Sequence, residues 1–208
     1  MYQVKEIYFT LQGEGAQTGR AAVFLRFAGC NLWSGLERDR AGAVCRFCDT
    51  DFIGTDGPGG GKFRSAEALA EAVARAWPGG GSPYVVITGG EPALQLDAPL
   101  IEALHVRVFE IGIETNGTLA LPAGVDWVCV SPKAGTELTV REGDELKLVY
   151  PQAGAPPSAF ESFAFDNFFL QPLDGPARDT NTRAALDYCR AHPKWRLSLQ
   201  THKLLGIP

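Results

Sequence analysis

Three cysteines near the amino terminus have a type and spacing that suit a metal centre. Fourteen residues separate Cys30 from Cys45, and two residues separate Cys45 from Cys48. Three thiolates leave one position of a four-coordinate centre without a protein ligand, whereas structural zinc sites usually close with four ligands. An iron–sulfur cluster with one iron free of protein ligands can bind a small molecule there. The spacing predicts such an open cluster site; a zinc or redox site remains an alternative, because Cys-x2-Cys suits both metals.

Polar residues that could line an active site follow most of the apolar, strand-like runs of the sequence. The carboxyl ends of parallel strands meet at one rim of a barrel, so five polar segments at matching positions predict a site at that rim. The five segments are Thr88-Gly89-Gly90-Glu91, Glu114-Thr115-Asn116-Gly117, Ser131-Pro132-Lys133, Gln171-Pro172-Leu173-Asp174 and Gln200-Thr201-His202-Lys203.

The elements that must position these residues are short strands that alternate with helices. Helical patterns are expected from Ser65, which can cap the first turn, to about residue 76, and over residues 96–104 and 180–191. Strands alternating with helices predict an α/β fold with a parallel sheet. An eight-stranded barrel usually needs about 250 residues, so a chain of 208 residues favours a partial, TIM-like barrel of about six strands. β-branched and aromatic residues indicate strands at 21–27, 84–88, 108–114, 125–130, 145–150, 168–170 and 195–199.

Composition and charge restrict the class of protein. No linker divides the chain, so residues 1–208 are expected to form one domain, with residues 31–44 as an insertion in the cysteine loop. A formal net charge of -5 argues against wide contact with nucleic acid. The first residues lack a signal-peptide pattern, and no apolar run approaches the roughly 20 residues that span a bilayer. We therefore expect reduced thiols, a cytoplasmic location and no membrane contact, with Cys129 and Cys189 as buried small hydrophobic residues.

Two of these motifs together resemble the radical S-adenosylmethionine (SAM) superfamily. They are Cys45-Arg46-Phe47-Cys48-Asp49-Thr50, with Cys30 upstream, and Thr88-Gly89-Gly90-Glu91-Pro92. The resemblance implies that Cys30, Cys45 and Cys48 hold a 4Fe-4S cluster and that SAM binds the fourth iron and yields a 5′-deoxyadenosyl radical on reduction. The usual pattern is Cys-x3-Cys-x2-Cys, and the longer first spacing is a departure. Lengthening a loop costs only about 0.6 kcal/mol per doubling, so the insertion is physically tolerable.

An ordered set of further motifs resembles the 7-carboxy-7-deazaguanine synthase family. That resemblance implies the conversion of 6-carboxy-5,6,7,8-tetrahydropterin to 7-carboxy-7-deazaguanine with loss of ammonia, in the pathway to 7-deazapurines such as queuosine. It also implies a requirement for Mg²⁺, a homodimer, and an electron donor such as flavodoxin or ferredoxin. A glycyl-radical-activase-type enzyme and a non-catalytic zinc-binding module remain open. The motifs lie at residues 7–15, 19–20, 24–27, 29–33, 48–50, 114–117, 131–133 and 171–174.

The resemblance also implies roles for single residues. Thr50 corresponds to the magnesium position, and Thr50, Glu114 and His202 are the expected catalytic residues. The residues expected to hold the pterin are Leu11, Gln12, Gly13, Glu14, Arg26, Thr88 and the final Pro208. The residues expected to contact SAM are Phe47, Cys48, Asp49, Gly90, Glu91, Ser131, Pro132, Lys133, Gln171, Pro172, Leu173 and Asp174.

Overall fold

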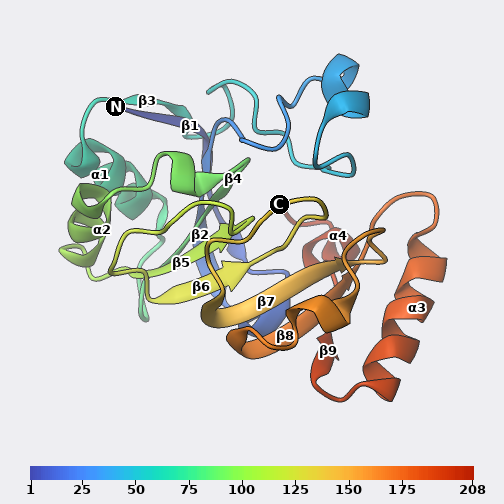
Figure 1. The fold of residues 1–208 in the computed structure, drawn as a ribbon. Coiled ribbons are helices and arrows are strands. Elements are labelled where there is room, and N and C mark those ends of the chain that lie inside the picture. The colour runs from blue at the N-terminus through green and yellow to red at the C-terminus, as the bar shows by residue number, and fades with distance from the viewer.

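The fold is built on one twisted sheet of nine strands, seen in a computed structural model that describes residues 1–208 (Figure 1). The strands follow the order β3-β1-β2-β4-β5-β6-β7-β8-β9. From β2 to β9 all neighbouring strands are parallel, whereas β1 is antiparallel to both β2 and β3. The strands are β1 (Tyr2–Leu11), β2 (Ala21–Phe27), β3 (Gly61–Phe63), β4 (Tyr84–Gly89), β5 (Glu110–Thr115), β6 (Trp127–Val130), β7 (Glu142–Tyr150), β8 (Ala164–Pro172) and β9 (Trp195–Leu197).

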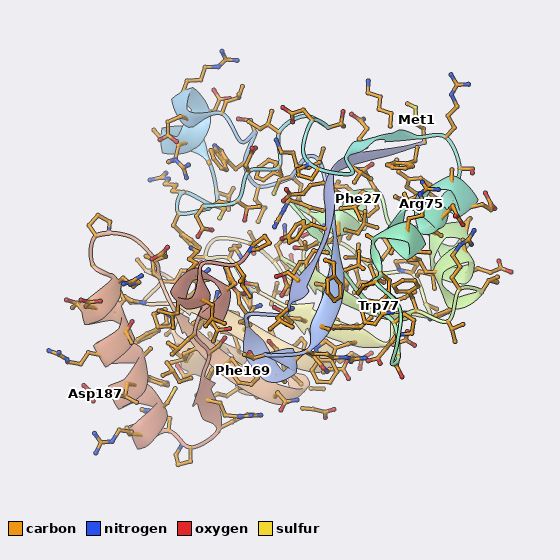
Figure 2. All side chains as sticks on the ribbon, turned by 180° about the vertical axis from the view of Figure 1, so that it is seen from behind. Met1, Phe27, Arg75, Trp77, Phe169 and Asp187 are labelled. Carbon is orange, nitrogen blue, oxygen red and sulfur yellow. The ribbon has the colours of Figure 1, made fainter.

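Three of the four α-helices pack on the outer face of this sheet, and the last one lies at the cavity described below. Figure 2 shows Arg75 on α1 and Asp187 on α3 at opposite flanks of the molecule, both directed outwards. The α-helices are α1 (Ala66–Ala76), α2 (Ala98–His105), α3 (Arg178–Ala191) and α4 (Thr201–Leu205). The 3-10 turns are η1 (Gly15–Gln17), η2 (Glu37–Gly42), η3 (Pro92–Leu94) and η4 (Pro157–Phe160).

The predicted α/β fold with a parallel sheet of the partial-barrel type is confirmed. Each of the seven predicted strands forms, and the Ser65 side chain accepts the N–H of Ala68 at the start of α1, as expected of a helix cap. The antiparallel strands β1 and β3 were not predicted. A bulge in β1 breaks the alternation that identifies a strand, because it leaves both Val4 and Lys5 buried.

The two faces of the sheet have different side chains because successive residues of a strand point to opposite sides. Outward residues such as Leu25 and Ile87 are fully buried against α1 and α2, and Leu148 packs in a second apolar cluster with α3. On the inner face, Phe24 and Val86 belong to a small third cluster. Two residues further along the same strands, the inner face becomes polar, and this change creates the site described next. No helix in the structure combines the length and the apolar character needed to cross a membrane.

Candidate active site

The carboxyl ends of the parallel strands surround a cavity of about 410 Å³. Its wall is formed by residues of β1 and β2, by the ends of β4, β5, β7 and β8, and by the cysteine loop, residues 45–51. Most of the residues singled out in the sequence line this cavity. They are Leu11, Gln12, Gly13, Glu14, Arg26, Cys45, Phe47, Cys48, Asp49, Thr50, Thr88, Glu114, Lys133, Gln171, Pro172, Leu173, Asp174, His202 and Pro208.

A smaller group of the expected site residues lies behind the cavity wall. This group consists of Cys30, Gly90, Glu91, Ser131 and Pro132. Lys133 Nζ donates to the backbone oxygen of Ser131 at 2.6 Å and to its Oγ at 2.8 Å. Burial lowers the pKa of Lys133, and the neighbouring thiols of Cys45 and Cys48 oppose that shift. Ser131 therefore reaches the cavity through the lysine whose position it fixes.

The three candidate cluster cysteines differ in the acidity of their thiols. All the cysteines are free, and a hydrogen bond from the Cys45 thiol lowers the pKa of Cys48 to about 6 in spite of burial. The same contact raises the pKa of Cys45. Burial raises the pKa of Cys30, while the N–H of Leu32 donates to its sulfur at 3.4 Å and opposes the shift. Because the thiolate is the metal ligand, the lowered pKa of Cys48 favours that role.

The surroundings of Cys30 fit a cluster held between two loops. A Cβ atom on Gly90 would lie 2.7 Å from the Cβ of Cys30 and 2.2 Å from the backbone oxygen of Gly29, so only glycine fits. The N–H of Glu91 donates to that same oxygen at 2.9 Å. No three His, Cys, Asp or Glu side chains gather closely enough to bind a single metal ion. The thiolates of a four-iron cluster bind different irons, so the donor set of three free thiols fits that group.

Glu91 occupies a different position from the one expected for a SAM ligand. Its side chain is 0% exposed and accepts hydrogen bonds from Thr115 Oγ1 at 2.7 Å and from the backbone N–H of Asn116 at 2.7 Å. The N–H of Ala93 donates to it at 2.9 Å. Burial raises the pKa of this carboxyl, and these donors oppose the shift. In this structure the carboxylate connects the loops after β4 and β5, and contact with the methionine amino group stays a prediction.

The insertion between the first two cysteines is attached to the cysteine loop. Figure 1 shows its short helical turn η2, in blue, projecting beyond the sheet. Arg40 in this turn donates to the backbone oxygens of Arg46 at 3.0 Å and Cys48 at 3.1 Å. Its guanidinium also lies 4.1 Å above the Trp33 ring, which packs edge-on against Phe52. The long spacing after Cys30 therefore contains a packed segment that holds the last cysteine in place.

Two lysines connect the cysteine loop to the rest of the cavity wall. Lys5, on β1, forms ion pairs with Asp51 at 2.9 Å and with Asp56 at 2.8 Å. Lys203, on α4, forms ion pairs with Asp49 and Asp174, each at 2.6 Å. Through Lys203, α4 joins the cysteine loop to the segment that follows β8.

The cavity wall also carries a network of charged side chains. Lys147 on β7 donates to Glu14 at 2.6 Å and to Glu114 at 3.0 Å. Burial alone would raise the pKa of Glu14, but the Lys147 ammonium lowers it to about 2. An unfolded glutamate titrates near 4.5, so this ion pair stabilises the fold above that pH and its contribution is lost as the pH falls toward 2.

Arg26 lies at the end of β2, where its guanidinium faces the cavity. Its Nε donates to Glu6 at 2.7 Å, and its Nη2 donates to the Tyr8 hydroxyl at 3.1 Å. These two bonds fix the plane of the guanidinium and leave other N–H donors of the group for a ligand carboxylate.

The last residues of the chain close one side of the cavity. Thr201, the first residue of α4, donates to the backbone oxygen of Gly13 through both its N–H and its hydroxyl, each at 2.9 Å. A Cβ atom on Gly13 would lie 2.3 Å from His202 Nδ1, so this glycine permits the close approach of the histidine. The Thr10 hydroxyl donates to the backbone oxygen of Pro208 at 3.0 Å.

Several cavity or network residues were missed in the sequence. Lys147 occupies an apolar strand in which Leu146 and Leu148 face the core, so the alternation of apolar and charged residues was the available signal. Glu6 and Tyr8 alternate on β1 in the same way, but the bulge obscures the period. Other missed cavity residues are Lys5, Phe24, Asp51 and Val149, whereas Gln200 and Lys203 belong to one of the predicted polar segments.

Comparisons with known proteins agree with this geometry. Residues 40–147 match the Radical SAM superfamily. The matched segment begins after Cys30 and contains Cys45 and Cys48. The crystal structure of QueE from Escherichia coli has a TM-score of 0.71 and 27% identity, and the alignment covers 95% of this chain and 93% of that chain.

Relatives that align over their full length identify the family within this superfamily. The 7-carboxy-7-deazaguanine synthase of Bordetella pertussis is 63% identical, over 100% of this chain and 99% of the relative. The enzyme of the same name from Bradyrhizobium diazoefficiens is 64% identical, over 99% of both chains. With its three cluster-type cysteines and the strand-end cavity, the chain therefore belongs to the radical SAM superfamily and, within it, to the 7-carboxy-7-deazaguanine synthase family.

Proposed function

We propose that this chain converts 6-carboxy-5,6,7,8-tetrahydropterin to 7-carboxy-7-deazaguanine with loss of ammonia, a step of 7-deazapurine (queuosine) biosynthesis. The observation that carries the proposal is a single cavity whose lining includes both thiols and two carboxylates that one lysine bridges. Thiolates suit a cluster, and carboxylates suit the N–H donors of an aminopyrimidinone. The names of the full-length relatives support the same reaction.

In this proposal the three cysteines, Cys30, Cys45 and Cys48, hold a 4Fe-4S cluster. Held by these residues, the cluster and SAM would supply the radical chemistry that removes a hydrogen atom from the substrate. Phe47 packs beside the adenine. The polar groups of Lys133, of Asp49 and of residues 171–174 bind the ribose and the amino-acid portion of SAM.

The substrate is proposed to lie between β1, β2 and β5. Gln12, Glu14 and Glu114 read the donor edge of the pterin, and Arg26 pairs with its carboxylate. Thr88 donates to Glu114 at 3.4 Å and holds it on the cavity wall.

The proposed partners follow from the chemistry of the cluster. A low-potential electron donor such as flavodoxin or ferredoxin supplies the reducing electron, and the reduced thiols favour the cytoplasm. We also propose a homodimer without stable binding of nucleic acid or membrane. Size-exclusion chromatography with light scattering measures the mass of the assembly directly.

Thr50 is proposed to place a hydroxyl oxygen on Mg²⁺, with substrate oxygens and water completing the octahedron. Changing Thr50 to alanine is expected to lower kcat/KM about 10-fold or more and to raise the Mg²⁺ concentration needed for half-maximal rate. Iron content should remain that of the wild type. An unchanged Mg²⁺ titration would show that this threonine has only a structural role.

Anaerobic turnover of the reconstituted protein with the carboxypterin tests the proposed function. Because the rearrangement is redox-neutral, SAM is expected to be regenerated, so many product molecules should form per SAM. Chromatography measures the amounts of product, ammonia and 5′-deoxyadenosine, and the amount of 5′-deoxyadenosine is compared with the amount of product. One 5′-deoxyadenosine accumulating per product molecule would contradict the reuse of SAM, and no product at all would overturn the function.

A further inference from the structure

Lys147 is a buried cation that contacts two carboxylates of the cavity wall. Its side chain is 5% exposed, and it does not line the cavity. Resting on the proposed function, we propose that Lys147 is a positioning residue that fixes Glu14 and Glu114 as paired acceptors for the donor edge of the aminopyrimidinone. Its Nζ is 2.6 Å from Glu14 Oε2 and 3.0 Å from Glu114 Oε1, so one ammonium bridges the two carboxylates.

The bridge matters because two carboxylates that share a site with no cation between them repel each other, and this repulsion favours protonation of one of the pair. One of them would take up a proton, and the protonated carboxyl would then present a donor to the substrate in place of an acceptor. With Lys147 in contact with both groups, each can remain a pure acceptor.

The other hydrogen-bond partners of the two carboxylates are also donors, so they too favour the ionised form. Gln200 Nε2 donates to Glu14 at 3.0 Å, and Gln12 Nε2 donates to Glu114 at 3.2 Å. Thr88 also donates to Glu114. An ionised carboxylate offers about four acceptor positions, so unshared electron pairs remain for a ligand. The pair therefore suits a ligand with adjacent N–H donors.

Other titratable groups surround Lys147 on the inner face. Glu145, two residues earlier on β7, accepts the N–H of Ala16 at 2.9 Å and the thiol of Cys129 at 3.5 Å. Lys133 lies further toward the cysteine loop and interacts with Lys147 only through its charge. Among these groups, Lys147 is the only cation that contacts either cavity carboxylate.

The test is the replacement of Lys147 by methionine, which removes the charge and keeps the length of the side chain. The KM for the carboxypterin at pH 7 is expected to rise about 10- to 100-fold, with iron content and SAM affinity unchanged. The ratio of variant KM to wild-type KM should fall between pH 6 and pH 9, because rising pH restores the second carboxylate. Equilibrium binding of the carboxypterin by anaerobic calorimetry should follow the same trend.

Matched variants separate this role from a loss of folding. Lys62→Met removes an exposed lysine on β3 and should leave KM unchanged, whereas Lys147→Arg should retain most of the affinity. If Lys147→Met does not fold, Lys147→Gln, which keeps a donor without charge, is measured in its place. A KM ratio that is independent of pH, or a fall in kcat alone, would overturn the assignment. A wild-type protein without carboxypterin turnover would instead overturn the proposed function, and this assignment with it.

Discussion

Replacement of Cys45 by alanine is expected to abolish carboxypterin turnover and to reduce iron from about four atoms per chain to less than one. Cys45 is 5% exposed and lines the cavity beside Cys48. With only three thiolates for the cluster, no spare protein ligand can replace a lost one. Iron and sulfide analysis after anaerobic reconstitution, together with the broad absorption near 400 nm, measures the effect.

Cys189 supplies the matched control for this variant. It is a partly buried thiol on α3, where it packs against the second apolar cluster. It belongs to a different element from the cysteine loop. Cys189→Ala should keep both the iron content and the turnover of the wild type. A Cys45→Ala protein that still binds four irons would show that this thiol is not a cluster ligand.

Replacement of Gly90 by alanine is expected to lower kcat/KM about 10²-fold or more, although Gly90 lies outside the cavity. The new Cβ would meet the backbone oxygen of Gly29 at 2.2 Å, and backbone atoms cannot rotate aside as a flexible side chain can. The loop that carries Cys30 must therefore move. Displacement of one thiolate should also lower the iron retained per chain and the rate of reconstitution.

Gly42, in turn η2 between Cys30 and Cys45, is a glycine with open space around its Cβ position and no left-handed backbone. Gly42→Ala should leave iron content and turnover unchanged. The thermal unfolding of both variants is measured alongside, because overpacking at Gly90 should lower the free energy of unfolding by about 1–3 kcal/mol. If Gly90→Ala has wild-type iron content and kinetics, the loops that carry Cys30 and Gly90 can move apart without disturbing the site, and the prediction is wrong.

Some parts of the site could be predicted because they depend on neighbours in the sequence. Thr88, Glu114 and Gln171 follow or end apolar runs, and the rule that parallel strands end at one rim was enough to bring them to one cavity. The cap at Ser65 is equally local and is confirmed.

Other positions depend on contacts that a local pattern does not contain. Glu91 occurs in a motif that resembles a cofactor-binding loop, yet here its carboxylate is satisfied by Thr115 and Asn116 from the next strand. Arg26 faces the cavity as expected. Its Nε, however, donates a hydrogen bond to Glu6, which lies on the neighbouring strand β1 next to the bulge.

The sequence by itself determined the kind of chemistry and the class of fold. Three cysteines without a fourth ligand, and strands that alternate with helices, are local features of type, spacing and period. The tertiary structure alone decided that Lys147 joins Glu14, 133 residues away, to Glu114, 33 residues away. A two-residue period shows that a side chain faces one side of its strand, but which distant side chains meet there depends on how the sheet curves and which strand ends converge.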